Sequence, residues 1–227
     1  MPNFQTPWDE NPSPVACDNL THVACALILD TSGSMCGAPI EQLNKGLSLF
    51  VRQTTDATLQ KCIDVALVSF GETVKSLQNF MPIGEMGTAP ELAAGGGTPM
   101  GGALDLALDL IEQRKNQYKE NSTPYHRPWV FCITDGAPTD DYLKAAQRLK
   151  ELERKKKVLG YCVGVDGFNA SKMKEIFDKD RIFKLDNIDF PSLFEFLSTS
   201  LEKLADSNPE EVDSVEVPAP KTLRMGG

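Results

Sequence analysis

Two kinds of segment alternate along this chain, and their alternation is the feature that most constrains the fold. Short continuous apolar runs occupy residues 23–29, 62–70, 129–133 and 158–165. Between them, apolar residues recur every three or four positions within 40–51, 104–111, 142–152 and 193–204. Continuous runs are typical of strands buried on both faces of a sheet, whereas the second spacing predicts amphipathic helices. Alternating strands and helices predict an α/β fold, in which helices cover both faces of a mostly parallel sheet.

One part of the chain departs from this alternation. Gly71 and Glu72 separate the run at 62–70 from a segment at 73–80 in which apolar and polar residues alternate. Two strands joined by so short a turn form a hairpin, so we expect one antiparallel edge strand. A short helix near 171–177 and a short strand at 181–185 complete the pattern. The expected architecture is Rossmann-like and doubly wound.

The two ends of the chain differ in composition from its middle. Residues 1–20 carry prolines at positions 2, 7, 12 and 14, and residues 206–227 are acidic, contain proline and end in Gly226-Gly227. Segments poor in large apolar groups bury too little surface to offset the entropy of ordering them. We therefore expect an N-terminal arm at 1–20, one domain at 21–205 and a flexible C-terminal tail at 206–227.

Charge and cysteine usage exclude several classes of protein. The 23 Lys and Arg residues against 32 Asp and Glu give a net charge of −9, which argues against a nucleic-acid partner. No apolar run reaches the roughly 18 residues needed to span a bilayer, so we expect no membrane partner. The six cysteines form no C-x-x-C pair, so the ligand spacings of zinc fingers are absent. The first twenty residues contain no Lys or Arg and no apolar stretch, so no secretory signal is visible. We therefore expect reduced thiols and a cytoplasmic protein.

Oxygen-bearing side chains follow the predicted strands at three distant places in the chain. In α/β sheets, ligands bind outside the carboxyl ends of the strands. Because parallel strands end at one edge, we expect five residues to converge there: Asp30, Ser32, Ser34, Thr98 and Asp135. Gly33 and the glycines at 95–97 allow their loops to approach each other closely. Two carboxylates and three hydroxyls are hard donors, which suit Mg²⁺.

These residues carry a family resemblance. The pattern Asp30-x-Ser32-x-Ser34, then Thr98, then Asp135 resembles the metal-ion-dependent adhesion site of von Willebrand factor A domains, over roughly residues 21–205. The stretches ILDTSGSMCGAPI, GGTPMGGAL and RPWVFCITDGAPTDD most resemble bacterial TerY-type proteins encoded with tellurite-resistance genes. The resemblance implies that the three hydroxyls bind Mg²⁺ (or Mn²⁺) directly and that the two carboxylates often act through water. It also implies that an acidic side chain of a partner protein completes the metal shell.

The function that these observations favour is metal-dependent protein binding. The resemblance implies a non-enzymatic adaptor in a cytoplasmic bacterial stress or tellurite-resistance system. One alternative is a signalling protein recognised or conjugated through Gly226-Gly227. A Mg²⁺-dependent hydrolase is a weaker alternative, because Ser32 stands where a dehalogenase-like phosphatase has a second Asp, and no G-x-S-x-G motif occurs. We expect His22 and His126 to be solvated rather than catalytic.

Two further expectations concern the surroundings of the site. A docking collar around the metal edge or ordinary loop packing would each account for five residues there: Met35, Cys36, Pro99, Met100 and Pro138. Asp140 and Asp141 precede the helix predicted at 142–152, so we expect them at its positive end.

Overall fold

A seven-stranded sheet forms the centre of the molecule. The computed structural model describes residues 14–15, 19–165, 167–207 and 223–225, the last three by their backbone alone. The strand order is β3-β2-β1-β4-β5-β6-β7. The strands are β1 (Val23–Asp30), β2 (Ile63–Phe70), β3 (Val74–Pro82), β4 (Trp129–Thr134), β5 (Leu159–Gly164), β6 (Ile182–Leu185) and β7 (Leu223–Met225). β1, β2, β4, β5 and β6 are parallel and β3 pairs antiparallel with β2, so the predicted mostly parallel sheet with an antiparallel edge is confirmed.

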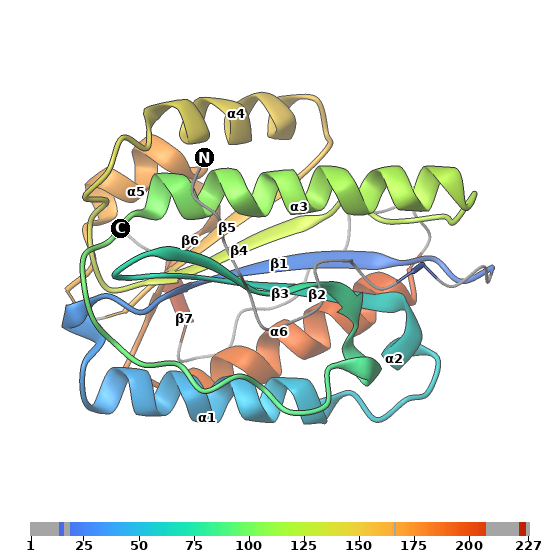
Figure 1. Cartoon of the computed structure of the whole chain (residues 1–227), viewed down its shortest axis with the longest axis horizontal. Helices are drawn as coiled ribbons and strands as arrows, with labels where there is room; N and C mark the ends of the chain where they lie inside the picture. Colours follow the sequence, from blue (N-terminus) through green and yellow to red (C-terminus); the bar gives the residue numbers. More distant parts are fainter. Residues whose placement is uncertain (1–13, 16–18, 166, 208–222, 226–227) are drawn as a thin grey trace.

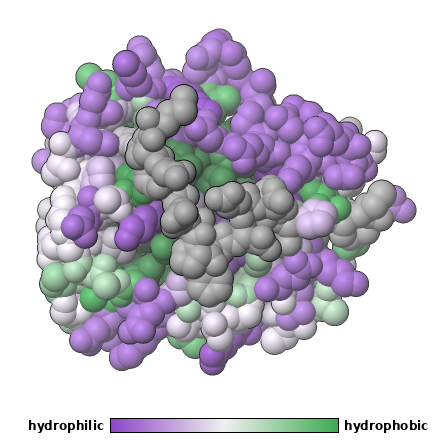
Figure 2. Space-filling model, in the orientation of Figure 1, coloured by the Kyte–Doolittle hydropathy of each residue, from purple (hydrophilic) through white to green (hydrophobic). Residues whose placement is uncertain are grey.

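Helices cover both faces of the sheet (Figure 1). They are α1 (Ala38–Gln53), α2 (Leu59–Cys62), α3 (Met100–Glu120), α4 (Leu143–Arg154), α5 (Ala170–Ile176) and α6 (Phe190–Ala205). α1 and α6 pack on one face, and α3, α4 and α5 pack on the other. Hydrophilic residues dominate the part of the surface in Figure 2 where Figure 1 shows α3 and α4. None of the helices in the described ranges is both long enough and apolar enough to cross a bilayer.

β1 explains why the core has two layers. All eight of its residues are buried, and its neighbours β2 and β4 are parallel to it. Successive side chains on a strand point to opposite faces. Leu27 therefore packs in the cluster beneath α1 and α6, and Ile28 packs in the cluster beneath α3. The continuous apolar run in the sequence corresponds to a strand covered on both sides.

The layer of α1 and α6 is closely packed at one glycine. A Cβ atom on Gly46 of α1 would lie 2.5 Å from Cδ2 of Phe194 and 3.0 Å from Cβ of Phe190, both on α6. Real Cβ atoms do not approach other atoms so closely. The absence of a side chain at Gly46 therefore sets the distance between the two helices.

Parts of both terminal segments contact the domain. Val15, in the segment expected to be an arm, is 6% exposed and belongs to the core beneath α3. Within the predicted flexible tail, Leu223–Met225 forms β7, which pairs antiparallel with β6 and places Leu223 opposite Leu185. The sheet thus has a second antiparallel edge that the apolar pattern did not indicate. Gly226 and Gly227 lie outside the described residues.

A buried polar network lies at the end of the sheet where β1 and β2 begin. Asp64 accepts hydrogen bonds from Nη2 of Arg114 (2.8 Å) and from the hydroxyl of Tyr118, and its Oδ2 lies 2.9 Å from Nδ1 of His22. All four residues are at most 1% exposed. Burial alone would lower the pKa of Arg114, but the neighbouring Asp64 carboxylate raises it. The carboxylate and guanidinium thus compensate each other's loss of hydration.

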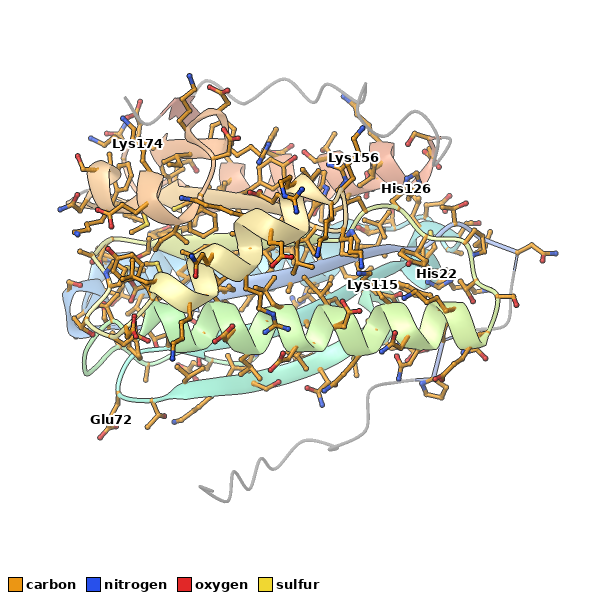
Figure 3. The ribbon with its side chains drawn as sticks, turned by 90° about the horizontal axis from the view of Figure 1, so that it is seen from above. His22, Glu72, Lys115, His126, Lys156 and Lys174 are labelled. Atoms are coloured by element: carbon orange, nitrogen blue, oxygen red, sulfur yellow. The ribbon has the colours of Figure 1, made fainter. Side chains whose placement is uncertain are left out.

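The expectation that both histidines are solvated is wrong. His22 is 0% exposed and His126 is 1% exposed. Figure 3 shows both at the end of the sheet opposite Glu72. His22 precedes β1 and forms an isolated bridge with Tyr125, so the segment at 122–128 folds against the start of the sheet and carries His126 inward. Burial lowers the pKa of His126.

Candidate metal centre

The loop that follows β1 is fixed by backbone hydrogen bonds to two other loops. The backbone N and side-chain Oγ1 of Thr31 both donate to O of Phe70, at 2.7 and 3.0 Å. Thr31 O accepts from N of Gly95 (2.8 Å), and N of Gly33 donates to O of Gly96 (3.0 Å). The loop then turns through a short 3₁₀ helix, Gly33–Met35. The glycine-rich segment thus lies directly against the segment that carries the first three candidate residues.

Glycine is required where these loops meet. Gly96 has a φ of +79°, and a Cβ atom there would lie 2.3 Å from Cα of Glu72. A Cβ atom on Gly71 would lie 2.6 Å from O of Thr31. Both positions exclude larger residues, because the obstructing atoms belong to the backbone and cannot rotate away. The close approach expected of the glycine run is what the structure shows.

Four of the five candidate residues are connected by hydrogen bonds. Oγ of Ser34 donates to Oδ1 of Asp135 (2.7 Å), and Oγ of Ser32 lies 3.0 Å from Oγ of Ser34. Asp30 accepts from the backbone N of Ser32 at Oδ1 (2.8 Å) and from Oγ1 of Thr134 at Oδ2 (2.6 Å). The carboxyl ends of β1 and β4 therefore bring these oxygens together. We call this end of the sheet, where the parallel strands finish, the carboxyl edge; it is different from the lateral edges formed by β3 and β7.

Thr98 reaches the same place from the loop before α3. A Cβ atom on Gly136, the residue after Asp135, would lie 3.4 Å from Oγ1 of Thr98. Two backbone-directed hydrogen bonds hold Thr98 there: its N donates to Oγ1 of Thr139, and its O accepts from N of Thr139, both at 2.9 Å. The structure thus brings Thr98 beside the segment that carries Asp135.

Asp140 has a different role from the one expected. Its Oδ1 accepts from N of Gly101 (3.0 Å) and its Oδ2 from N of Gly102 (2.8 Å). It therefore satisfies the free N–H groups in the first turn of α3 rather than of α4. Only Asp141 lies at α4, where its Oδ1 accepts from N of Leu143 (3.2 Å). The sequence could not indicate this, because Asp140 and Gly102 are 38 positions apart.

The electrostatics of the site favour a hard cation. Asp30 is 0%, Ser32 2%, Thr98 7% and Asp135 9% exposed. Burial raises the pKa of Asp30, although its hydrogen bonds with Ser32 and Thr134 oppose the shift. A cation placed between two such carboxylates would compensate their loss of hydration. The described residues contain no group of three or more His, Cys, Asp or Glu side chains suited to a metal, so a metal here would depend on the hydroxyls. The donor set fits Mg²⁺ or Mn²⁺, which prefer hard oxygen ligands.

For two of the five residues around the site, ordinary packing is the alternative that holds. Met35 is 0% and Met100 is 1% exposed, so both belong to the core. Cys36 is exposed, and Pro99 and Pro138 are half-buried. Sequence analysis did not identify Leu143, which is 61% exposed at the start of α4. The apolar surface that stays exposed here is therefore different from the one that the sequence indicated.

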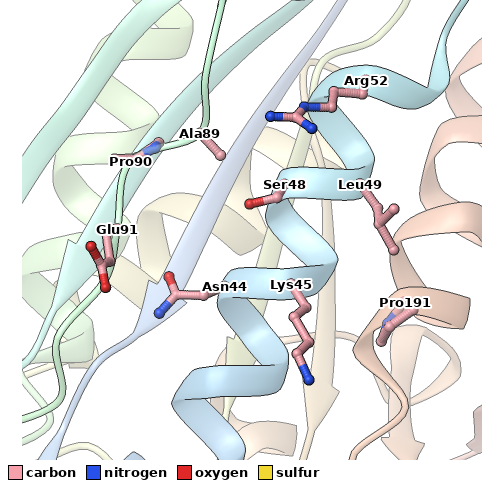
Figure 4. A pocket seen from close by; sticks show the side chains of 9 residues that line it. All are labelled: Asn44, Lys45, Ser48, Leu49, Arg52, Ala89, Pro90, Glu91 and Pro191. Atoms are coloured by element: carbon pink, nitrogen blue, oxygen red, sulfur yellow. The ribbon is translucent and has the colours of Figure 1, made fainter.

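A separate groove lies on the outer side of α1 (Figure 4). It has a volume of about 580 Å³ and is lined by Asn44, Lys45, Ser48, Leu49, Arg52, Ala89, Pro90, Glu91 and Pro191. Asn44 fixes one wall, because its side chain exchanges two hydrogen bonds with the backbone of Leu92 (2.8 and 2.9 Å). None of the five candidate residues lines this groove, so it is distinct from the carboxyl edge.

Comparison with known proteins agrees with the fold described above. The family model of the von Willebrand factor type A domain matches residues 25–196. The human collagen alpha-6(VI) chain is 30% identical over 87 residues, which is 38% of this chain and 4% of that protein. The matched region is thus a small part of a much longer relative.

Solved structures share the fold at low sequence identity. The vWF domain of the pilus tip protein Mfa5 from Porphyromonas gingivalis is 11% identical, with a TM-score of 0.59 over 83% of this chain and 98% of that one. Manganese-loaded TRAP protein from Plasmodium vivax is 19% identical, with a TM-score of 0.51 over 76% and 71%. Proximal thread matrix protein 1 from the mussel byssus has a TM-score of 0.56 and 17% identity over 82% of this chain and 49% of that one. The family match covers most of the chain and the described fold agrees with it: this chain belongs to the von Willebrand factor type A domain family.

Proposed function

We propose that this chain is a protein-binding module whose binding depends on a divalent cation, Mg²⁺ or Mn²⁺, at the carboxyl edge. The family is one of protein-interaction domains, and the proposal concerns what this member uses to bind. One observation carries it: hydroxyls and carboxylates from three distant segments gather at one edge, where Ser34 bonds to Asp135 and Thr98 lies beside Gly136. Helix capping or loop packing alone would not require oxygen-bearing side chains from three segments to gather at one place.

Each candidate residue has a defined part in this proposal. Ser32, Ser34 and Thr98 would hold the cation directly through their hydroxyl oxygens, and Asp30 and Asp135 would act through water, as the resemblance implies. A hydroxyl has one proton and two lone pairs. When Ser34 donates its proton to Asp135, one of its lone pairs accepts from Oγ of Ser32 and the other remains available for the cation. The hydrogen bond therefore orients Ser34 for ligation rather than competing with it.

The partner supplies the remaining ligand. When bound, the cation offers an open position that an acidic side chain of the partner can occupy. The two carboxylates, acting through water, would leave the charge of a divalent ion nearly balanced, so an incoming carboxylate would be attracted mainly by the open coordination position and would not be held irreversibly. Manganese-loaded TRAP, which shares the fold, supports the choice of cation.

Binding rather than catalysis is the role proposed for this site. A hydrolase would need a general base that reaches its substrate. Both histidines are almost fully buried, and Figure 3 shows them at the opposite end of the sheet from Glu72, whose hairpin adjoins the glycine loop. The site also holds Ser32 where a second carboxylate would serve phosphoryl chemistry. These features support a non-enzymatic module.

The proposal also includes a cellular setting. The resemblance to TerY-type proteins supports a role in a cytoplasmic bacterial stress or tellurite-resistance system. Among the described cysteines, Cys25, Cys36, Cys132 and Cys162 are free thiols. Free thiols are usual in a reducing compartment, and this supports the cytoplasmic assignment.

An affinity capture from native lysate tests the proposal. Wild type, Thr98→Ala and Thr98→Ser are each used as bait, with Mg²⁺ or with EDTA. The expected result is a protein retained by wild type and by Thr98→Ser in Mg²⁺, and lost with Thr98→Ala or EDTA. The serine variant is the matched control, because it keeps the ligating hydroxyl. A partner retained equally in all six samples would contradict the proposal.

A further inference from the structure

We propose that Thr139 is a positioning residue for the metal site, and that it acts by holding Thr98. This inference rests on the proposed metal-dependent function and names a residue outside the five candidate ligands. Thr139 lies in the loop after β4, four positions beyond Asp135. Its side chain is directed to the backbone of Thr98 rather than to the gathered oxygens.

The geometry around Thr98 explains why such a residue is needed. Among the described residues, no hydrogen bond holds the Thr98 hydroxyl itself, so the position of that hydroxyl depends on its backbone. Thr139 bonds to this backbone on both sides, accepting from N of Thr98 at Oγ1 and donating from its own N to O of Thr98, each at 2.9 Å. A Cβ atom on Gly97 would lie 3.2 Å from Oγ1 of Thr139, so the two loops are in close contact as well.

The loop that contains Thr139 joins all three segments of the site. Asp135 accepts from Ser34 of the first segment, Thr139 holds Thr98 of the second, and Asp140 accepts from N of Gly102 in the first turn of α3. Residues 135–140 therefore fix the separation between the first and second segments. Metal ligands need this support, because loss of an outer partner typically lowers metal affinity by 10–100-fold.

Thr139 is also well suited to substitution. It is exposed, so a change there leaves no cavity in the core. Thr139→Val keeps the shape of the side chain and the N–H that donates to Thr98, and removes only the Oγ1 acceptor. Thr139→Ser keeps that acceptor. Thr73→Val is a matched control, because Thr73 is exposed in the β2–β3 turn at the same edge and its hydroxyl has no hydrogen bond to another described residue.

The test is a titration of each full-length variant with Mn²⁺ alone, with free Mn²⁺ followed by its electron paramagnetic resonance signal. Melting temperatures without metal are measured in parallel. The inference predicts that Thr139→Val binds Mn²⁺ at least tenfold more weakly than wild type, whereas Thr139→Ser and Thr73→Val bind within about threefold of it. Without metal, the melting temperatures of Thr139→Ser and Thr73→Val should agree with that of wild type, and that of Thr139→Val should fall only slightly, because the bond from N of Thr98 is only partly buried.

Two outcomes would overturn the inference and are distinguishable from failure of the proposed function. If wild type binds Mn²⁺ and Thr139→Val binds equally well, Thr139 does not position the site, although the metal function stands. If Thr139→Val melts at a much lower temperature than wild type without metal, and Thr139→Ser binds Mn²⁺ as weakly as Thr139→Val does, the role of Thr139 is structural only. If wild type itself binds no Mn²⁺, the proposed function fails first.

Discussion

Oγ of Ser34 donates a hydrogen bond of 2.7 Å to Oδ1 of Asp135, although 101 positions separate the two residues. The bond exists because β1 and β4 are adjacent and parallel, so the loops after them leave the sheet at one edge. From the sequence, the contact between the two residues can be predicted only from the two strands that precede them. The arrangement of the sheet thus determines the arrangement of the site, and this relation supports several predictions.

Asp30→Ala should reduce stability as well as any metal binding. Asp30 is fully buried and accepts from N of Ser32 and from Oγ1 of Thr134, so its removal leaves two donors without an acceptor. Unsatisfied buried donors cost about 1–3 kcal/mol each. Urea denaturation without metal should therefore show a loss of about 2–6 kcal/mol in the free energy of unfolding, the sum for the two donors. An unchanged midpoint would contradict the role assigned to these two bonds.

Arg114→Met should destabilise the fold strongly and leave Mn²⁺ affinity unchanged in the folded protein. It leaves the carboxylate of Asp64 buried without its cation, which typically costs about 3–5 kcal/mol. Arg148→Met is the matched control, because Arg148 also makes two side-chain bonds to carboxylates, those of Asp105 and Asp109, but its side chain is 36% exposed. Exposed pairs contribute at most about 1 kcal/mol. Chemical denaturation of both variants measures the difference, and equal losses would show that burial does not decide the cost.

Gly46→Ala should destabilise the packing of α1 against α6. The new Cβ atom would lie 2.5 Å from Cδ2 of Phe194, and overpacking of this kind costs about 1–3 kcal/mol. Gly102→Ala, in the first turn of α3, places its nearest neighbour at 3.4 Å and serves as control. Alanine favours helix over glycine by up to about 1 kcal/mol, so the control should be neutral or stabilising. Thermal unfolding of the two variants tests the contrast, which would be refuted by equal melting temperatures.

The stability of the wild type should fall as the pH decreases below about 6.5, partly because of His126. Burial lowers the pKa of His126 from its usual value of 6.5 in the folded protein. Between the two values the unfolded chain binds a proton that the folded chain does not, so the free energy of unfolding rises with pH there. In His126→Gln, the loss of stability between pH 7.5 and pH 5.5 should be smaller. Denaturant midpoints at both values provide the measurement, and an unchanged difference would refute the assignment to His126.

Much of the fold could be predicted because its signals are local. The run around Leu27 and the three-to-four spacing around Leu47 each reflect burial of one element. Their alternation is sufficient to predict a mostly parallel sheet covered by helices. β7 escaped detection because three residues have no periodicity, and their pairing with β6 depends on the edge that β6 leaves open. Asp140 was assigned to the wrong helix for a similar reason, because its partners are distant in sequence.

The candidate site was accessible from the sequence to the extent that it follows strand ends. Asp30 and Asp135 come directly after apolar runs, and Thr98 follows a glycine run that a close approach requires. The histidines were misassigned because a lone histidine in a polar stretch gives no sign of burial. His22 is enclosed by residues such as Asp64 and Tyr118, which are brought to it only by the folded sheet.

The most direct test of the account is a calorimetric titration of wild type, Thr98→Ala and Thr98→Ser with Mn²⁺ and with Mg²⁺. Thr98 is the most suitable ligand to remove, because its hydroxyl makes no hydrogen bond to another described residue and its loss should leave the metal-free fold intact. We expect one divalent cation per chain for wild type, affinity at least tenfold lower for Thr98→Ala, and near wild-type affinity for Thr98→Ser. Equal affinities of wild type and Thr98→Ala, at equal melting temperatures, would contradict a metal site built from these three segments.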